Sequence, residues 1–185
     1  MRIVVGITGA SGAPLAMRLL ENLREHETHL IISRNAWEVI KFELGENVHF
    51  PCSYSYREDD FSSPLASSSF PIDAVVVIPC SMKTLAAIAH GYADNLITRA
   101  AENALKMGKP LILVPRETPL SLMDIENMMK AKQAGAVILP AMVAYYHRPR
   151  SVEDITDFIV GKVLDVLGIE HRLYSRWGET KPPPS

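Results

Sequence analysis

Residues 2–14 read RIVVGITGASGAP, and they give the strongest indication of how the chain folds. An apolar run from Ile3 to Thr8 leads directly into the small-residue turn Gly9–Gly12. Pro14 then stands at the first turn of the expected helix, a position where the missing proline N–H costs nothing. The stretch therefore predicts a buried strand, a tight turn and a helix start in immediate succession.

The same succession of strand and helix recurs along the chain. The apolar runs are rich in Val and Ile and lack polar alternation, which is typical of strands buried on both faces. Segments with helical spacing, such as Leu15–Leu23 and Leu96–Ala104, lie between them. Because parallel neighbours need connections that can hold a helix, we expect a single doubly wound, mostly parallel α/β sheet, flavodoxin-like or Rossmann-like, with helices on both faces. The five runs are Ile3–Thr8, His29–Ser33, Ala74–Pro79, Leu111–Pro115 and Ala136–Pro140.

Length and composition predict one compact unit. With 185 residues, of which 48% are hydrophobic, the chain is long enough for one well-buried core and short for two ordinary domains. We expect residues 1–179 to form a single α/β domain. Residues 180–185 include three consecutive prolines, which do not pack as regular structure, so we expect a disordered tail there.

Charge and cysteine content exclude several functions. The formal net charge of -2 provides no basic field that would attract nucleic acid or an anionic membrane. Cys52 and Cys80 have no paired spacing and no histidine cluster beside them, so the sequence predicts neither a disulfide framework nor a metal site. No apolar stretch approaches the roughly 20 residues of a membrane-spanning helix, and no secretory signal is expected. These features favour a soluble cytoplasmic protein.

One connection is unusually long for a compact domain. Gly45–Pro71 is rich in Ser and Tyr and carries the charged run Arg57–Asp60. Connections of this length are usually functional or mobile. We expect part of it to form a lid or a contact between subunits.

Ligands of such sheets bind at the carboxyl ends of the strands. The turn Gly9–Gly12 exposes backbone N–H groups at the positive end of a helix dipole, which suits a phosphate, and Thr8 and Ser11 add hydroxyl donors. The alternative is that the small residues only let strand and helix pack closely, since the full G-x-G-x-x-G spacing is absent.

Two further strand ends carry polar residues. Pro79–Thr84 aims hydroxyl and backbone donors at the same crevice, although Ser81 is also an ordinary helix N-cap. Arg116 follows the next strand, and its planar guanidinium matches the oxygens of a phosphate. Glu117 adds a carboxylate beside it. Both turns therefore predict contacts with an anionic ligand.

Two other segments combine cations with further binding groups. Arg99, Glu102 and Lys106 share one face of a predicted helix, a pattern that also describes a plain solvated surface. Tyr145–Arg150 combines aromatic rings with cations, which suits an anionic and partly apolar ligand, although single aromatic residues more often serve packing.

In combination and in order, these motifs are more specific than any of them alone. From residue 2 to 179 the chain resembles the UbiX-type flavin prenyltransferases. Members of that family bind FMN and dimethylallyl phosphate and join the dimethylallyl group to N5 and C6 of reduced FMN, without a metal. UbiD-type decarboxylases use the resulting prenylated FMN. The motifs are GASGA, PCSMKTLAAIAHGYADNL, LVPRETPL, ENM, GAVILP, YYHRPRSVEDI and RWGE.

The resemblance implies a role for each matched residue. It implies that Glu43 lies near the reacting flavin, that Ser11 moves a proton or orients flavin N5, and that Trp177 stabilises the allylic cation. The implied FMN-binding residues are Gly9, Ala10, Ser11, Ser33, Ser81, Met82, Lys83, Thr84 and Arg116. The implied substrate-binding residues are Arg99, Lys106, Glu117, Tyr146 and Lys162. The implied catalytic residues are Ser11, Glu43, Lys106, Glu117 and Trp177.

The resemblance also implies an assembly. Members of the family form large homo-oligomers with sites shared between subunits, so a dodecamer is expected, with His147–Arg150 and Trp177 acting across an interface. The implied substrate-binding residues are expected around the crevice at the strand ends. Ser67–Ser69 stands where relatives have a glycine, which predicts an altered lid.

Two other functions stay open. A flavin-dependent decarboxylase of peptidyl cysteine shares the fold, and His90 would be its catalytic histidine. A non-catalytic flavin carrier or decarboxylase subunit would bind FMN and leave dimethylallyl phosphate intact.

Overall fold

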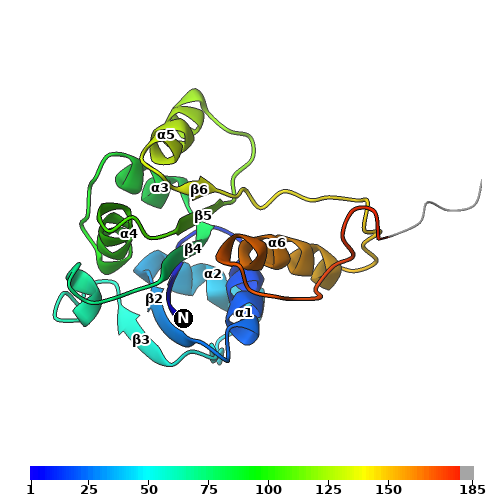
Figure 1. Ribbon diagram of the computed structural model, residues 1–185, viewed down its shortest axis with the longest axis horizontal. Helices are drawn as coiled ribbons and strands as arrows, with labels where there is room; N and C mark the ends of the chain where they lie inside the picture. The colour runs from blue at the N-terminus through cyan, green and yellow to red at the C-terminus, as the bar shows by residue number, and fades with distance from the viewer. Residues whose placement is uncertain (180–185) are drawn as a thin grey trace, which may run out of the picture.

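The computed structural model describes residues 1–179, which contain a sheet of six parallel strands (Figure 1). The strands are β1 (Arg2–Ile7), β2 (Glu27–Ile32), β3 (Tyr54–Arg57), β4 (Ala74–Cys80), β5 (Leu111–Pro115) and β6 (Val137–Ile138). Their order in the sheet is β3-β2-β1-β4-β5-β6, so the direction of strand addition reverses between β1 and β4. Such a reversal opens a crevice at the carboxyl ends of the two strands. The predicted fold class is confirmed.

Helices cover both faces of the sheet (Figure 1). They are α1 (Ala13–Asn22), α2 (Arg34–Leu44), α3 (Met82–Ala89), α4 (Leu96–Lys106), α5 (Leu122–Gln133) and α6 (Val152–Leu167), with a short 3₁₀ helix η1 (Pro64–Ala66). One core lies between the sheet and α1, α2 and α6. The other lies between the sheet and α3, α4 and α5. The sheet therefore separates two sets of helices.

The central strand β1 is buried on both sides. Ile3 and Val5 enter the core under α1 and α6, whereas Val4 enters the core under α4. A Cβ added to Gly6 would lie 2.8 Å from Cγ2 of Ile97, which belongs to α4. Glycine is therefore required where α4 passes closest to β1.

The expectation of five strands was wrong by one. All five apolar runs contain a strand, but β3 lies inside the long connection 45–71 and forms the edge of the sheet next to β2. Its residues Tyr54, Ser55 and Arg57 are exposed, so no apolar run marks it. An edge strand with one neighbour needs less apolar surface than a central strand.

Polar and aromatic contacts hold β3 against β2. His29 of β2 is buried, and its ring stacks on Tyr54 with the ring centroids 4.9 Å apart. Nδ1 of His29 lies 3.1 Å from the Tyr56 hydroxyl, and Nε2 lies 2.9 Å from Oε1 of Glu27. These contacts take the place of the apolar pairs that fix the central strands.

The chain after α6 folds back along that helix. A Cβ on Gly161 of α6 would lie 2.6 Å from Cε1 of Tyr174 and 2.7 Å from Cε1 of His171. The absent side chain thus makes room for the returning segment. The expected tail, 180–185, lies outside the described residues. Within residues 1–179, every helix is too short or too polar to cross a bilayer.

The variant Gly161→Ala tests whether close packing or helix propensity has the larger effect on stability at this position. Propensity alone predicts that alanine stabilises a helix interior by about 1 kcal/mol. The contacts with Tyr174 and His171 predict a loss of about 1–3 kcal/mol instead, because the new methyl group overpacks the site. Urea denaturation followed by circular dichroism measures the free energy of unfolding.

The matched control is Val166→Ala, at a partly exposed position of the same helix. We expect it to change stability by no more than about 0.5 kcal/mol. A Gly161→Ala protein more stable than the parent would contradict the proposed packing of the C-terminal segment.

Candidate functional site

A cavity of about 330 Å³ opens at the carboxyl ends of β1, β2 and β4. We call it the switch-point cavity, because it lies where the strand order reverses. The turn after β1 and the first turns of α2, α3 and α4 surround it. Its lining includes the predicted residues Gly9, Ser33, Ser81, Lys83 and Thr84. Arg34, Asn35, Glu58, Asn95 and Ile97 complete the lining.

Three helices begin at this cavity, each with a polar cap. The Ser33 side chain accepts the N–H of Ala36 at 3.2 Å at the start of α2. The Ser81 side chain accepts the N–H of Thr84 at 3.3 Å at the start of α3, whose first turn also holds Met82 and Lys83. Asn95 caps α4 in the same way. The positive ends of three helix dipoles therefore lie at the cavity, which favours a phosphate or another anion.

Thr8 joins the two central strands beneath the cavity. Its buried hydroxyl donates to the carbonyl oxygen of Pro79 at 2.8 Å and accepts the N–H of Ser81 at 2.7 Å. The single hydroxyl hydrogen is thus already used, and the expected donation from Thr8 to a phosphate was wrong. Thr8 instead fixes the end of β4, and the Ser81 cap, against the end of β1.

Glu43 occupies the start of α1, where the sequence predicts phosphate. Its carboxylate accepts the N–H of Gly12 at 2.9 Å and the N–H of Ala13 at 2.7 Å. A side chain of α2 therefore compensates the positive end of the α1 dipole. These two N–H groups therefore already have an acceptor, and the phosphate contact expected of the turn stays a prediction for Gly9, Ala10 and Ser11. Ser11 is exposed at the same turn, and Ala10 is buried beneath it.

Sequence reasoning missed Arg34, Asn35 and Glu58, which form one wall of the cavity. Oε1 of Glu58 accepts the backbone N–H of Arg34 at 2.6 Å, and the Glu58 carbonyl accepts the N–H of Leu96 at 2.7 Å. Glu58 therefore connects the starts of α2 and α4. Arg34 and Asn35 directly follow Ser33 at the end of a predicted strand, and this position could have marked them as site residues. Glu58 follows β3, which no pattern marked.

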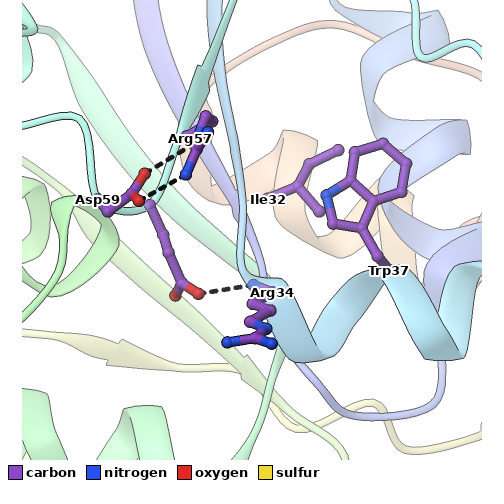
Figure 2. Close-up of a pocket in the computed structure, with 6 residues that line it drawn as sticks. Ile32, Arg34, Trp37, Arg57 and Asp59 are labelled. Carbon is purple, nitrogen blue, oxygen red and sulfur yellow. Dashed lines mark hydrogen bonds and ion pairs between the residues drawn. The ribbon is translucent and has the colours of Figure 1, made fainter.

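A second cavity, of about 500 Å³, adjoins the first through Arg34 and Glu58. Figure 2 shows Arg57 paired with Asp59 on one side of it and Trp37 on the other. Nη2 of Arg57 lies 2.7 Å from Oδ2 of Asp59. Because Glu58 binds the backbone of Arg34 rather than its side chain, the Arg34 guanidinium stands as a cation at the border of the two cavities.

Arg116 follows β5 and carries a buried guanidinium nitrogen without a partner. Within the described residues, Nε of Arg116 has no hydrogen-bond acceptor, whereas buried polar groups nearly always have one. An acceptor on a bound flavin fits this nitrogen. Burial raises the pKa of the neighbouring Cys80 thiol to about 12, so the thiol stays protonated and is not a nucleophile. Glu117 is exposed next to Arg116.

Arg99 and Lys106 form a separate cluster on α4. Nη1 of Arg99 and Nζ of Lys106 each lie 2.7 Å from an oxygen of Glu102. The hydrogen bond from Lys106 is the largest influence on Glu102 and lowers its pKa; burial opposes it, and Arg99 assists it. A helix rises about 1.5 Å per residue, so Lys106 at the last position of α4 lies about 15 Å from Leu96 at the first. Lys106 therefore lies far from the cavity of its own chain.

Tyr146, Lys162 and Trp177 form another cluster, beside α6. The rings of Tyr146 and Trp177 meet edge to face with centroids 5.3 Å apart. Nζ of Lys162 lies 5.9 Å from the ring centroid of Phe158, which packs against Tyr146 at 5.9 Å. This cluster and the one on α4 lie on opposite faces of the sheet (Figure 1). The expectation that the substrate-binding residues surround one crevice was therefore wrong for a single chain, because the sheet separates them.

Asp165 anchors the segment that carries Trp177. Its carboxylate accepts a hydrogen bond from the Tyr174 hydroxyl at 2.6 Å and another from Nη2 of Arg176 at 2.7 Å. Burial alone would raise the pKa of Asp165, but hydrogen bonds from Arg176, Tyr174 and His171 lower it to about 2. The ionised carboxylate thus ties the residues just before Trp177 to α6. Within residues 1–179, no three His, Cys, Asp or Glu side chains are grouped to hold a metal ion.

Replacing Glu43 tests its role at the start of α1. In Glu43→Ala the N–H groups of Gly12 and Ala13 lose their acceptor, so we expect a loss of about 1–2 kcal/mol in unfolding free energy, as for other N-caps. Glu43→Gln keeps an acceptor oxygen and recovers part of that loss. Glu38→Ala on the same helix is the control, since Glu38 pairs with Lys41 only at the exposed surface, at 3.6 Å. Equal losses in the Glu43 and Glu38 variants would exclude the capping role.

The low pKa of Asp165 predicts how the stability of the protein depends on pH. Its folded pKa of about 2 lies below the ordinary value of 3.8, so its contribution is present above that value and is lost as the pH falls toward 2. We expect Asp165→Asn to be less stable than the parent protein at neutral pH, and the difference to shrink from about pH 5 downward. Tyr174→Phe, which removes one hydrogen bond, shows a smaller change of the same sign. Urea denaturation at each pH measures both, and a difference that does not vary with pH refutes the assignment.

Comparisons with known proteins agree with this geometry. Residues 1–164 match the model of the Flavoprotein family. The flavin prenyltransferase UbiX of Methanocaldococcus jannaschii is 50% identical over 182 residues, which cover 96% of this chain and 99% of that protein. The solved structure of AnUbiX (PadA1) in complex with FMN and dimethylallyl pyrophosphate has a TM-score of 0.92 and 42% identity, covering 97% of this chain and 98% of that chain. The dodecameric FMN-dependent UbiX-like decarboxylase from Escherichia coli O157:H7 has a TM-score of 0.92 and 44% identity, covering 96% of this chain and 99% of that chain.

These matches extend over nearly all of the chain, and they include the strand ends that build the switch-point cavity. The sequence motifs, the order of the strands and the similar proteins lead to one assignment. The chain belongs to the family of UbiX-type flavin prenyltransferases.

Proposed function

We propose that the chain transfers the dimethylallyl group of dimethylallyl phosphate to N5 and C6 of reduced FMN, making prenylated FMN without a metal. The observation that carries this proposal is the anion-binding cavity at the strand ends, with the unpartnered Nε of Arg116 at the end of the next strand. AnUbiX, 42% identical, is solved with FMN and dimethylallyl pyrophosphate, which supports both ligand classes. Reduced FMN supplies the nucleophile and is therefore a substrate as well as a ligand.

The residues around the switch-point cavity hold FMN. The start of α3 offers backbone N–H groups, and Lys83 in its first turn adds a cation suited to the FMN phosphate. Arg116 donates from Nε to the flavin. Glu43 acts indirectly, because it fixes the turn that carries Ser11 by binding the N–H groups that follow. Glu43 is therefore a positioning residue in this proposal.

The prenyl donor is bound between copies of the chain. One chain holds Arg99 and Lys106 on one face of its sheet and Tyr146 and Lys162 on the other. A neighbouring copy that places its own helix at the cavity brings these groups together. The E. coli relative is dodecameric, and we assign a dodecamer to this chain.

The surface carries apolar side chains that support such an assembly. Phe42 is 90% exposed, Trp177 80% and Tyr145 77%. On α5, Leu122 and Met123 are also exposed. Assembly would remove this apolar surface from water, so we expect these positions at contacts between copies.

The chemistry explains why cations and aromatic rings are both needed. Breaking the C–O bond of an allylic phosphate leaves positive charge on the C5 unit, which the faces of Tyr146 and Trp177 stabilise. Lys106 and Lys162 compensate the charge of the departing phosphate, with Arg99 and Glu117 completing its contacts. Ser11 orients flavin N5 or moves its proton. Contact between copies excludes water, which protects the cation.

The product and its location follow from the family and the composition. We assign prenylated FMN to a UbiD-type decarboxylase as the recipient. We place the reaction in the cytoplasm, as the cysteine usage of the chain favours.

The structure does not favour a cysteine decarboxylase. His90, its candidate catalytic residue, is exposed at the end of α3, and its Nε2 lies 3.1 Å from Oδ1 of Asn127. His90 is not among the residues that line the switch-point cavity. That reaction would therefore lack its histidine at the flavin.

Anaerobic incubation with reduced FMN and dimethylallyl phosphate tests the function. We expect the extracted flavin to gain one C5 unit by mass spectrometry and inorganic phosphate to be released in equal amount. Lys106→Ala retains FMN and loses this turnover, because Lys106 lies outside the flavin cavity. Lys109→Ala, a control at an exposed lysine just beyond α4, keeps it. Bound but unmodified FMN with intact dimethylallyl phosphate would identify a flavin carrier instead.

Mixing two inactive variants tests whether the site is shared. Lys106→Ala and Lys162→Ala each lack one cation, but a mixed oligomer contains interfaces where one copy supplies Lys106 and its neighbour Lys162. After subunits are exchanged, we expect a fraction of parent activity in the mixture and none in either variant exchanged with itself. Absence of recovery, with exchange confirmed by native mass spectrometry, would place both lysines in sites of a single copy.

A further inference from the structure

A third cavity, separate from the switch-point cavity, lies between the loop before α6 and the C-terminal segment. Its volume is about 380 Å³. Two arginines, a histidine and the start of α6 surround it, and we call it the arginine cavity. The lining residues that matter here are His147, Arg148, Arg150, Asp154, Tyr174 and Ser175. Neither Tyr146 nor Lys162, assigned above to the prenyl donor, lines this cavity.

The arginine cavity holds two guanidinium groups and one carboxylate, so its charged lining is positive on balance. Within residues 1–179, neither Arg148 nor Arg150 forms an ion pair. The carboxylate of Asp154 also lines the cavity, but its Oδ2 accepts the backbone N–H of Arg150 at 2.7 Å and that of Ser151 at 3.1 Å. These bonds hold the Asp154 carboxylate at the start of α6, and the two guanidinium groups still outnumber it in the cavity.

His147 adds an unsatisfied polar group. Both ring nitrogens are buried and, among the described residues, neither has a hydrogen-bond partner. The ring is held in place by stacking on Phe158, with centroids 4.9 Å apart and planes 7° apart. Buried imidazole nitrogens normally have a partner, so a ligand with strong hydrogen-bonding oxygens would satisfy this group.

The backbone at Arg148 is unusual in the same place. Its φ is 56°, the only positive φ of a non-glycine residue in the described chain. The Arg148 N–H donates to the Tyr145 carbonyl at 3.0 Å and closes the turn. Side chains other than glycine adopt this conformation at an energetic cost, and such residues gather at ligand clamps. Glycine would adopt this φ without strain, but the sequence has an arginine here.

We propose that the arginine cavity binds a phosphate group, either free orthophosphate or the phosphoryl group of a phosphomonoester. Two guanidinium groups match phosphate oxygens in charge and geometry, and an imidazole N–H supplies a further donor. The Ser175 hydroxyl offers another donor at the rim. The inference goes beyond the proposed function, since none of these residues is assigned to FMN or to the prenyl donor.

Calorimetric titration with inorganic phosphate tests the site. The oligomer is first saturated with FMN, so that the flavin phosphate site is filled, and is kept in a phosphate-free buffer of constant ionic strength. We expect Arg148→Gln and Arg150→Gln each to weaken phosphate binding by about tenfold or more, as for a lost charged hydrogen bond. Arg172→Gln, which removes the same charge from an exposed residue outside the cavity, leaves the affinity unchanged.

Two further variants keep the result interpretable. Arg148→Gly retains the turn, because glycine adopts positive φ without strain, and it weakens phosphate binding as Arg148→Gln does. Lys162→Ala, at the proposed prenyl-donor site, retains this phosphate binding. Equal affinity in the parent protein and both arginine variants overturns the proposal, as does a parent protein that binds no phosphate in the millimolar range.

A second titration with dimethylallyl phosphate separates the two sources of the ligand. If Lys162→Ala still binds the ester through Arg148 and Arg150, the cavity accepts phosphomonoesters. If only orthophosphate depends on these arginines, the cavity is a site for the free anion. Neither titration requires turnover, so loss of the prenyltransferase proposal would leave this one standing, and the reverse is equally true.

Discussion

The hydroxyl of Thr8 holds the ends of β1 and β4 together, and the rest of the site depends on this contact. It binds the Pro79 carbonyl at 2.8 Å and the Ser81 N–H at 2.7 Å at the point where the strand order reverses. The backbone N–H of Thr8 also donates to the Pro79 carbonyl, at 3.3 Å, so both polar groups of Thr8 fix the start of α3 relative to the turn after β1. Glu43 fixes that turn from the other side. The two side chains occupy backbone groups that a ligand would otherwise take, and Glu58 does the same at the start of α2. The start of α3 is therefore the place that we propose for an anion.

The sheet that creates the cavity also divides the groups that we propose for the prenyl transfer. The cations of α4 and the aromatic cluster beside α6 are held in place within one chain, the first by Glu102 and the second by the Asp165 network. Each cluster is therefore organised before assembly but lies on its own face. A single copy is in this view a flavin-binding unit that presents one part of the donor site on each face, and the oligomer completes the site. The exposed Trp177 and Tyr145 are consistent with surfaces that other copies cover.

Sequence patterns predict those features that depend on burial or on position next to a strand. The central strands are apolar because both of their faces are covered, and Ser81 was found because it directly follows a strand. Ser33 also follows a strand but was named only through the family resemblance. The strand β3 was not predicted, because an edge strand needs no apolar run. The roles of Thr8 and Glu43 were not predicted, because each depends on a partner that only the fold brings close. That partner is Ser81 for Thr8 and Gly12 for Glu43. The sequence did not predict that Lys106 and Lys162 lie on opposite faces of the sheet, because a helical pattern does not say which face the helix will cover.

A crystal structure of the assembled protein with FMN and dimethylallyl phosphate would show whether one copy or two build the donor site. We predict that FMN contacts Arg116 and the starts of α2 and α3 of one copy, while Lys106 and Lys162 reach the donor phosphate from different copies. A structure in which Arg116, Lys106 and Lys162 of a single copy bind both ligands would show instead that each copy carries a complete site.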